Sequence, residues 1–232
     1  MPAVATTPPR SGTLRRATRA LSNGLHRAAN ESPQAAALER ALDEALSGCT
    51  VPSGGVIVEV GGRRPALAAR FPGARYLSMD YQVAVRPDVA GDAHALPLAD
   101  GAVHLYVATW LLYFSRDPQR WMAEVRRVLA PGGGALMSFE FAVYGVNLGD
   151  TQGTDWMRYT KATVAELGRG FARADIIPVG SPHTIYANWL WKHLKHGGLW
   201  MRMPLGLLLH QWARVGAADS PFPVTFLFVG TK

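Results

Sequence analysis

Cysteine is nearly absent from this chain, because Cys49 is the one cysteine among its 232 residues. A disulfide framework and a cysteine-rich metal site are therefore excluded. The spacing of the His, Asp and Glu residues does not suggest a metal site either, and no Ser-His-Asp or Cys-His pattern stands out. A lone cysteine favours a reducing compartment.

Long apolar runs are also missing. A membrane-spanning helix needs about 18 consecutive apolar residues, and the longest nearly apolar stretch, Gly101–Phe114, is interrupted by His104. The N-terminus is rich in arginine and superficially resembles a transit peptide, but it lacks the apolar segment of a secretory signal. Because Ala, Arg and Gly are frequent throughout, we interpret residues 1–32 as the disordered basic tail of a cytoplasmic bacterial protein.

Acidic residues are missing from two segments, and these segments explain much of the net charge of +7. The tail has several arginines before its first acid, Glu31. The segment from Ile176 to Ala218 has no acid at all, and its Lys and Arg residues are Lys192, Lys195, Arg202 and Arg214. Such regions can indicate nucleic acid, anionic lipid or an acidic substrate as a partner. A merely solvated basic surface is the alternative, and we expect no nucleic-acid partner.

The stretch from Val56 to Asp80 has the pattern strand, glycine turn, helix, strand, acid. Val56–Val60 is β-branched and apolar, as expected for a strand buried inside a parallel sheet. Gly61-Gly62 allows a ligand to approach the main chain. An acid about 20 residues beyond such a turn holds a ribose in Rossmann-type units. This stretch therefore predicts a nucleoside-binding βαβ unit.

Strands and helices alternate along the rest of the chain, which predicts an α/β, Rossmann-like, doubly wound sheet of seven strands with helices on both faces. Helices are expected from Ser32-Pro33 to Leu46, from Asp117-Pro118 to Leu129, and over 160–167. A turn is expected at Pro131–Gly134. The expected strands are 56–60, 76–79, a very short one ending at Asp92, 102–108, 135–141, 174–179 and 224–229.

The segment 182–218 is predicted to form two amphipathic helices. Their apolar stripes are Tyr186, Leu190 and Leu194 in the first, and Leu205, Leu208, Leu209 and Trp212 in the second. We interpret this Trp-rich, basic segment as a lid or as the surface of a homodimer. Peripheral membrane contact is the alternative, since Trp and Lys/Arg beside an apolar stripe suit a membrane interface.

Three separated motifs lie between residues 56 and 139. They are residues 58–62 (VEVGG), 91–103 (GDAHALPLADGAV) and 127–133 (RVLAPGG). They resemble the first motif, the "GDA-x-x-LPF-x-D-x-x-F" segment and the "R-V-L-x-P-G-G" segment of class I S-adenosylmethionine (SAM)-dependent methyltransferases. Residues 155–160 and the ending 228–232 also resemble a subgroup of small-molecule methyltransferases with a substrate-covering insertion.

The resemblance implies a SAM site at the carboxyl ends of the strands. Asp80 would accept hydrogen bonds from both ribose hydroxyls, and Asp92 would accept one from the adenine amine. Glu59 would lie below the methionine end. The implied cofactor-binding residues are Glu59, Gly61, Gly62, Asp80, Tyr81, Asp92, Ala93, Ala108 and Trp110.

Two segments are interpreted as lid insertions into a domain of residues 33–232. They are 144–159 and 182–218, and the candidate catalytic residues expected there in contact with the substrate are His183, Tyr144, Asp155, Arg158 and Tyr159. We interpret His94 and His104 as packing residues instead.

The sequence departs from the family's G-x-G at Arg63, whose side chain would crowd the cofactor. We predict SAM-dependent methyl transfer to a small molecule, such as a product of secondary or cell-envelope metabolism. Two alternatives stay open. One is a non-methylating reaction on the same fold, such as cyclisation or elimination. The other is a non-catalytic SAM-binding or membrane-surface protein.

Overall fold

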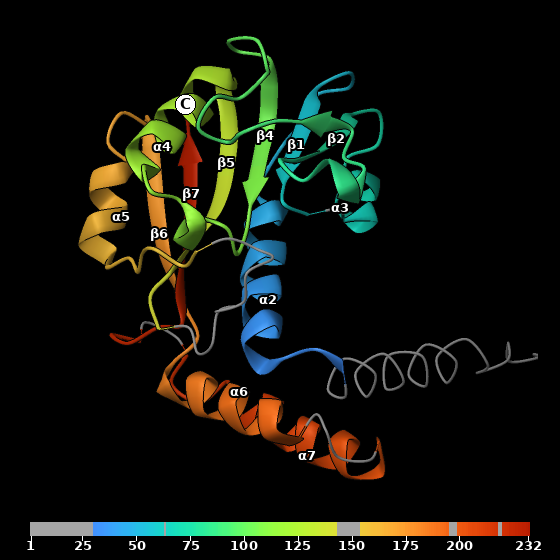
Figure 1. Cartoon of the computed structure of the whole chain (residues 1–232), viewed down its shortest axis with the longest axis vertical. Coiled ribbons are helices and arrows are strands. Elements are labelled where there is room, and N and C mark those ends of the chain that lie inside the picture. The colour runs from blue at the N-terminus through green and yellow to red at the C-terminus, as the bar shows by residue number, and fades with distance from the viewer. Residues whose placement is uncertain (1–29, 63, 143–153, 195–198, 218–219) are drawn as a thin grey trace, which may run out of the picture.

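The computed structural model describes residues 30–62, 64–142, 154–194, 199–217 and 220–232. Its centre is a seven-stranded sheet of order β3-β2-β1-β4-β5-β7-β6 (Figure 1). In chain order the strands are β1 (Val56–Val60), β2 (Arg75–Asp80), β3 (Val89–Ala90), β4 (Val103–Ala108), β5 (Leu129–Glu140), β6 (Arg173–Val179) and β7 (Thr225–Thr231). All pairings are parallel from β3 to β5, whereas β7 runs antiparallel to β5 and β6.

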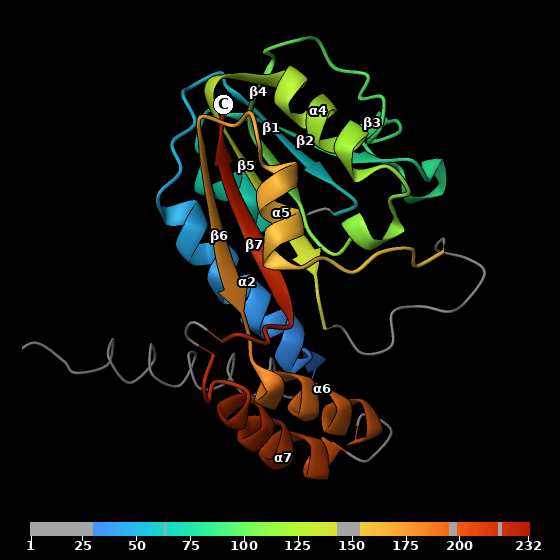
Figure 2. The ribbon, with the colours of Figure 1, turned by 90° about the vertical axis from the view of Figure 1, so that its left-hand side faces the viewer.

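Helices cover both faces of this sheet. They are α2 (Pro33–Ser47), α3 (Pro65–Arg70), α4 (Pro118–Val128) and α5 (Lys161–Leu167), with short 3₁₀ turns η1 (Val83–Val85) and η2 (Leu112–Phe114). Figure 2 shows α2 on one side of the sheet and α4 and α5 on the other. Neighbouring strand residues point to opposite cores: Val58 packs in the cluster with α4 and α5, and Ile57 in the cluster with α2 and α3. The predicted doubly wound fold is confirmed.

The predicted helix starts are also confirmed. The Ser32 hydroxyl caps α2 by accepting a hydrogen bond from the Ala35 N–H at 3.2 Å, and Pro33 lies in the first turn. Asp117 caps α4 in the same way, because its Oδ1 accepts from the Arg120 N–H at 2.9 Å. Each cap satisfies a backbone donor that has no partner inside its helix.

The turn predicted at Pro131–Gly134 is wrong, since β5 runs through these residues. The pairing of β5 with β4 shifts register there, with Leu129 opposite Val103 and Gly134 opposite Leu105. Gly132 has φ +74°, and a Cβ on Gly133 would lie 2.9 Å from the Ala130 carbonyl oxygen. The glycines therefore let the strand bulge without leaving the sheet.

Two further helices, α6 (Pro182–Leu194) and α7 (Leu199–Trp212), form a hairpin beyond the carboxyl end of β6 (Figures 1 and 2). The Thr184 hydroxyl in α6 donates to the Ala213 carbonyl at 2.7 Å, and the Asn188 amide donates to the Gln34 side chain of α2 at 2.9 Å. These buried bonds fix the hairpin to itself and to the N-terminal end of α2. None of the helices in the described ranges combines the length and apolar character needed to cross a membrane.

Most residues of the apolar stripes predicted for this hairpin are exposed, although Leu209 is buried in its core. Tyr186, Leu190 and Leu208 are exposed, whereas Ala187 and Ala213 are buried together with Leu209. Small and polar residues let the two helices approach closely, which leaves the large apolar residues outside. The two predicted amphipathic helices are therefore present, with most of their stripe residues on the outside.

The tail prediction falls largely on residues 1–29, which lie outside the described residues. Asn30 to Ser32, included in that predicted tail, belong to the described structure. The Glu31 carbonyl oxygen lies 3.0 Å from His210 Nε2 of α7, so the chain before α2 contacts the hairpin.

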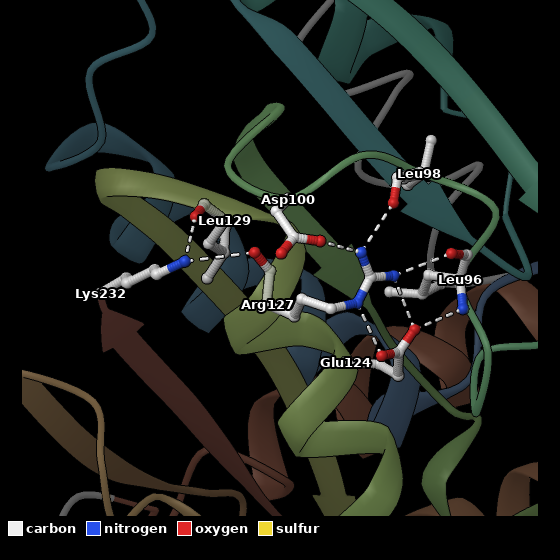
Figure 3. A network of polar contacts seen from close by, with 7 residues as sticks. All are labelled: Leu96, Leu98, Asp100, Glu124, Arg127, Leu129 and Lys232. Atoms are coloured by element: carbon white, nitrogen blue, oxygen red, sulfur yellow. Dashed lines mark hydrogen bonds and ion pairs between the residues drawn. The ribbon is translucent and has the colours of Figure 1, made fainter.

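Arg127, at the end of α4, holds the loop before β4 in place (Figure 3). Its guanidinium donates to the carbonyl oxygens of Leu96 and Leu98, both at 2.9 Å, and to Asp100 at 2.6 Å. Glu124 binds the same guanidinium at 2.8 Å and accepts from the Leu96 N–H. The second and third sequence motifs are therefore parts of one polar network.

We expect Arg127→Met to destabilise the fold by about 2–3 kcal/mol, because it leaves two carbonyls and the partly buried Glu124 without their donor. The measurement is urea unfolding. The matched control is Arg169→Met, since Arg169 forms an exposed pair with Glu166 and should change stability by less than about 0.5 kcal/mol. Equal losses in the two variants would contradict the proposed role of Arg127.

Candidate functional site

The parallel pairing of the strands brings the predicted site residues to one edge of the sheet. The Gly61 N–H donates to the Met79 carbonyl at 2.9 Å, and the Gly91 N–H donates to the Asp80 carbonyl at 3.1 Å. Val60 lies opposite Ala108. The glycine turn, Asp80, Asp92 and the end of β4 therefore leave the sheet side by side, as the βαβ pattern predicts.

Asp80 and Asp92 each use one carboxylate oxygen to shape their own loop. Asp80 Oδ1 accepts from the Gln82 N–H at 2.8 Å, and Asp92 Oδ1 accepts from the His94 N–H at 2.9 Å. The pKa of Asp92 is lowered, chiefly by that backbone bond. Within the described part of the chain, the second oxygen of each carboxylate accepts no hydrogen bond. Each aspartate thus keeps acceptor capacity for a ligand.

His94 links the loop of Asp92 to the loop after β4. Its Nδ1 lies 2.8 Å from Asp92 Oδ1, its Nε2 lies 2.7 Å from Ser115 Oγ, and its ring meets the Trp121 edge. The order Asp-His-Ser resembles a hydrolase triad. However, Ser115 is 0% exposed, so no substrate can reach its hydroxyl. The arrangement positions two loops.

His104 has a structural partner as well, because its Nδ1 lies 3.1 Å from the Val56 N–H donor. This contact joins the start of β1 to β4, at the edge opposite the candidate site. It agrees with the interpretation of His104 as a packing residue.

Glu59 is a buried carboxylate, 1% exposed, that Arg64 neutralises. Its Oε2 accepts from the Arg64 N–H at 2.9 Å and from the Tyr76 hydroxyl, and its Oε1 lies 3.1 Å from Arg64 Nη1. Arg64 Nη2 donates to the Thr109 hydroxyl at 2.6 Å and lies 3.1 Å from Glu39. One guanidinium therefore connects α2, β1 and the end of β4.

Arg64 is a site residue that the sequence patterns did not identify. The predicted crowding concerns Arg63, which lies outside the described residues. Arg64 is instead the arginine that fills the space beside Glu59. Its three partners are 5, 25 and 45 positions away in the chain, so no local motif indicates them.

Side chains of the protein itself pack directly against the two glycines of the turn. A Cβ on Gly61, whose φ is +68°, would lie 2.5 Å from the Leu111 side chain, and a Cβ on Gly62 would lie 2.4 Å from Glu59 Oε1. Internal packing already requires glycine at both positions. Leu111 therefore lies where the resemblance places the approach to the cofactor.

The remaining predicted cofactor residues differ in their exposure. Tyr81 is 64% exposed beside Asp80, whereas Ala93 is buried and Ala108 is 0% exposed. Ala108 offers no accessible side-chain surface to a ligand. Trp110 has φ +60°, and its N–H donates to the Ser138 hydroxyl at 2.8 Å. A non-glycine residue in this conformation stores strain, which is frequent at functional sites.

Glu140, at the carboxyl end of β5, is linked through Ser138 to the backbone of Trp110. We call the bend that follows β4 at this residue the Trp110 turn. The Ser138 hydroxyl donates to Glu140 Oε1 at 2.6 Å and accepts from Trp110. Glu140 is 0% exposed, and its Oε2 has no hydrogen-bond partner among the described residues. Burial raises the pKa of Glu140 to about 8, against the opposing effects of the Ser138 bond and the Arg158 charge. An acid inside the apolar run Phe139–Phe141 was the signal in the sequence.

The predicted substrate-contacting residues separate into groups. Asp155 and Arg158 form an ion pair next to Trp156, whose N–H donates to the Tyr113 carbonyl at 2.7 Å. Tyr159 is buried, with its hydroxyl donating to the Leu112 carbonyl at 2.8 Å, which is a structural position.

The other two candidates do not lie in this group. His183 lies in the hairpin with its ring against Trp212, 5.8 Å between centres. Tyr144 lies outside the described residues.

A hollow of about 290 Å³ lies away from Asp80 and Asp92. Residues of α5, β6, β7 and the loop before β7 line it, including Lys161, Pro178 and Phe226. The hollow is therefore not part of the sheet edge that carries these two aspartates. Across the described ranges, no group of three or more His, Cys, Asp or Glu residues is placed to hold a metal ion.

The fold and the edge carboxylates together define a class of protein. A seven-stranded sheet of order 3-2-1-4-5-7-6 with an antiparallel β7 is the class I methyltransferase fold. Residues 63–137 match the family model described as a methyltransferase domain. Residues 63–137 are therefore similar to a methyltransferase domain, within a chain that has the class I methyltransferase fold. No curated protein sequence matches the chain.

Solved structures share this fold at low sequence identity. A Haemonchus contortus phosphoethanolamine N-methyltransferase 2 is 13% identical over 82% of this chain and 52% of its own, with a TM-score of 0.53. The [4+2]-cyclase SpnF is 19% identical over 88% and 83% (TM-score 0.52). A Haloferax volcanii putative methyltransferase, in complex with the Trm112 activator, is 17% identical over 90% and 96% (TM-score 0.51). The chain spans about half the length of the Haemonchus contortus enzyme.

We expect the stability of this protein to fall as pH rises from about 4.5 to about 8 because of Glu140. The unfolded chain releases this proton near 4.5, whereas the folded chain keeps it up to about 8. The folded state therefore binds more protons in this window, and stability falls by up to about 1.4 kcal/mol per pH unit.

Glu140→Gln removes this contribution. Measured by urea unfolding across the window, the variant should gain stability relative to the parent as pH rises. The control Glu166→Gln changes an exposed carboxylate and should show no such trend. A constant difference between Glu140→Gln and the parent at all pH values would contradict the raised pKa.

Proposed function

We propose that this protein transfers the methyl group of SAM to a small-molecule acceptor, such as one in secondary or cell-envelope metabolism. The observation that carries the proposal is the pair of edge carboxylates, Asp80 and Asp92, each with an acceptor oxygen to spare at the ends of neighbouring strands. This arrangement suits a nucleoside, whose ribose hydroxyls and adenine amine are donors. A methyltransferase domain in the same residues supports SAM as that nucleoside.

SAM supplies an already activated methyl group on its sulfonium. In the proposed reaction, the acceptor forms a bond to this methyl carbon as the carbon–sulfur bond breaks, and S-adenosylhomocysteine leaves with the bonding electron pair. The protein's task is mainly alignment of the acceptor with the methyl group. Asp80 and Asp92 would fix the nucleoside, and the Trp110 turn, held by Ser138 and Glu140, would support the reacting end.

If the methionine end of SAM binds at Glu59, its ammonium group competes with Arg64 for the Glu59 carboxylate. Glu59 would pair with the methionine ammonium, but in this structure its carboxylate contacts Arg64 and Tyr76. A bound ammonium therefore requires Arg64 to move from Oε1. The guanidinium freed in this way would be available to bind the methionine carboxylate, which is an anion.

The acceptor would lie beside the segment 154–158, which packs on η2. Trp156 is exposed there, with the Arg116 guanidinium 3.9 Å from its ring centre. Burial is the main reason that the pKa of Tyr113 is raised, with a smaller contribution from Glu140. The Tyr113 hydroxyl therefore stays protonated near neutral pH. A tyrosine in this state can orient an acceptor but does not deprotonate it.

We expect Asp80→Asn to weaken binding of S-adenosylhomocysteine about 100-fold and Asp92→Asn about tenfold, measured by isothermal titration calorimetry. Asn keeps an oxygen for the bond from Gln82 or His94 but replaces the spare acceptor by a donor. Asp80→Asn is expected to lose two hydrogen bonds to a charged group, and Asp92→Asn is expected to lose one.

Two controls accompany this titration. Asp175→Ala removes an acid paired with Arg173 on β6 and should leave binding unchanged. Methylthioadenosine, which lacks the amino-acid end, should bind the parent protein more weakly than S-adenosylhomocysteine if Glu59 receives the ammonium. Undiminished affinity in both Asn variants would contradict the assignment of the nucleoside site.

A non-methylating reaction is the second candidate function. Arg64 at Glu59 and Leu111 at Gly61 occupy the methionine end with the protein's own side chains, and a [4+2]-cyclase shares the fold. Turnover of an acceptor without any methyl donor would favour cyclisation or elimination. Turnover that depends on SAM and releases S-adenosylhomocysteine would favour methyl transfer.

A further inference from the structure

We infer that the α6–α7 hairpin binds the surface of an anionic lipid bilayer. The inference starts from large apolar side chains that the hairpin leaves in solvent. Together they define the hairpin patch, which consists of Tyr186, Trp189, Leu190, Leu205, Leu208 and Trp212.

The patch is continuous across both helices. Tyr186 of α6 and Trp212 of α7 stack with ring centres 6.4 Å apart and an interplanar angle of 19°. The patch residues of each helix follow helical spacing of three or four residues, so they share one face. The other face of α6, with Thr184, Ala187 and Asn188, is buried against α7 and α2.

The charged residues of the hairpin segment itself are all of one sign. The sequence from Ile176 to Ala218 contains no Asp or Glu, and Arg214 is exposed next to the end of α7. His193 is exposed in the last turn of α6. The acid nearest in sequence before α2 is Glu31, whose backbone carbonyl oxygen lies 3.0 Å from His210 Nε2. An apolar face with Trp and Tyr, on a segment whose own charged residues are all basic, has the character of a helix lying in an anionic interface.

The same charge disfavours a second copy of this chain as the occupant. A two-fold dimer through the patch would bring two acid-free basic segments together, and like charges across an interface are costly. An anionic bilayer supplies the negative charge that this surface lacks. The hairpin lies beyond the carboxyl end of β6 (Figure 1), so a bilayer at the patch would contact the end of the molecule opposite the C-terminus of β7.

The test is flotation of the protein (residues 1–232) with phosphatidylcholine vesicles, with and without phosphatidylglycerol. The parent protein should float with the anionic vesicles, less so at high salt, and remain unbound with the neutral ones. The double variant Trp189→Ser/Leu208→Ser should partition about 100-fold more weakly, and Arg214→Glu about tenfold more weakly. Far-ultraviolet circular dichroism verifies that each variant is folded.

The matched control is Val83→Ser, because Val83 is 70% exposed on η1 and Leu208 is 66% exposed on the patch. This control should float like the parent. Equal flotation of the double variant and the parent would overturn the inference, since another region, such as the basic N-terminal segment, would then bind the vesicles. A parent that does not float, or that forms a dimer dissociated by Leu208→Ser, would also overturn it. Neither outcome depends on the proposed methyl transfer.

Discussion

The parallel pairing of β1 with β2 and β4 is the constraint on which the candidate site depends. It places the glycine turn, Asp80 and the Trp110 turn at one edge, although these residues are far apart in the sequence. The bond from the Gly91 N–H to the Asp80 carbonyl extends this edge to Asp92. Asp80 lies on β2, and the other residues follow the ends of their strands within two positions, so rigid strands fix where this edge lies.

Ion pairs and hydrogen bonds of charged side chains also shape this edge. Arg127 binds the carbonyls of the loop between β3 and β4 and the carboxylates that flank it, so the loop carrying Asp92 has a fixed course. Arg64 serves Glu59 in a comparable way. Both arginines supply charge and hydrogen bonds to groups that lose their hydration on burial. Glu140 differs, because its second oxygen has no described partner, and its protonation replaces an ion pair. Stability is reduced there beside a strained turn, as is frequent at functional sites.

The sequence patterns predicted the fold well because strand and helix signals are local. Apolar β-branched runs, the Ser32 and Asp117 caps, and the alternation of elements all gave the observed sheet. The Pro131–Gly134 segment was mispredicted because glycine permits a bulge as readily as a turn. Periodicity also identified the apolar stripes of the hairpin, but it does not show whether such a face is covered, so a lid, a dimer surface and a membrane contact all stayed open.

The site was predictable only in part for a related reason. Asp80 and Asp92 follow strands directly, so their neighbourhood follows from topology. The contacts of Arg64 with Glu39, Glu59 and Thr109 join separate elements, and no spacing rule anticipates them. Glu140 was visible as an acid in an apolar strand, whereas its missing partner depends on how Arg158 and Asp155 pair. Long-range side-chain pairing is therefore the information that only the three-dimensional structure supplied.

The central claim is that the edge carboxylates hold SAM while Arg64 yields Glu59 to its methionine end. A crystal structure with S-adenosylhomocysteine tests this claim most directly. The predicted result has the ribose hydroxyls on Asp80, the adenine amine on Asp92, and the ammonium beside Glu59 with the Arg64 guanidinium displaced. A ligand bound elsewhere, or bound at this edge with the ribose away from Asp80 and Arg64 still on Glu59, would contradict it.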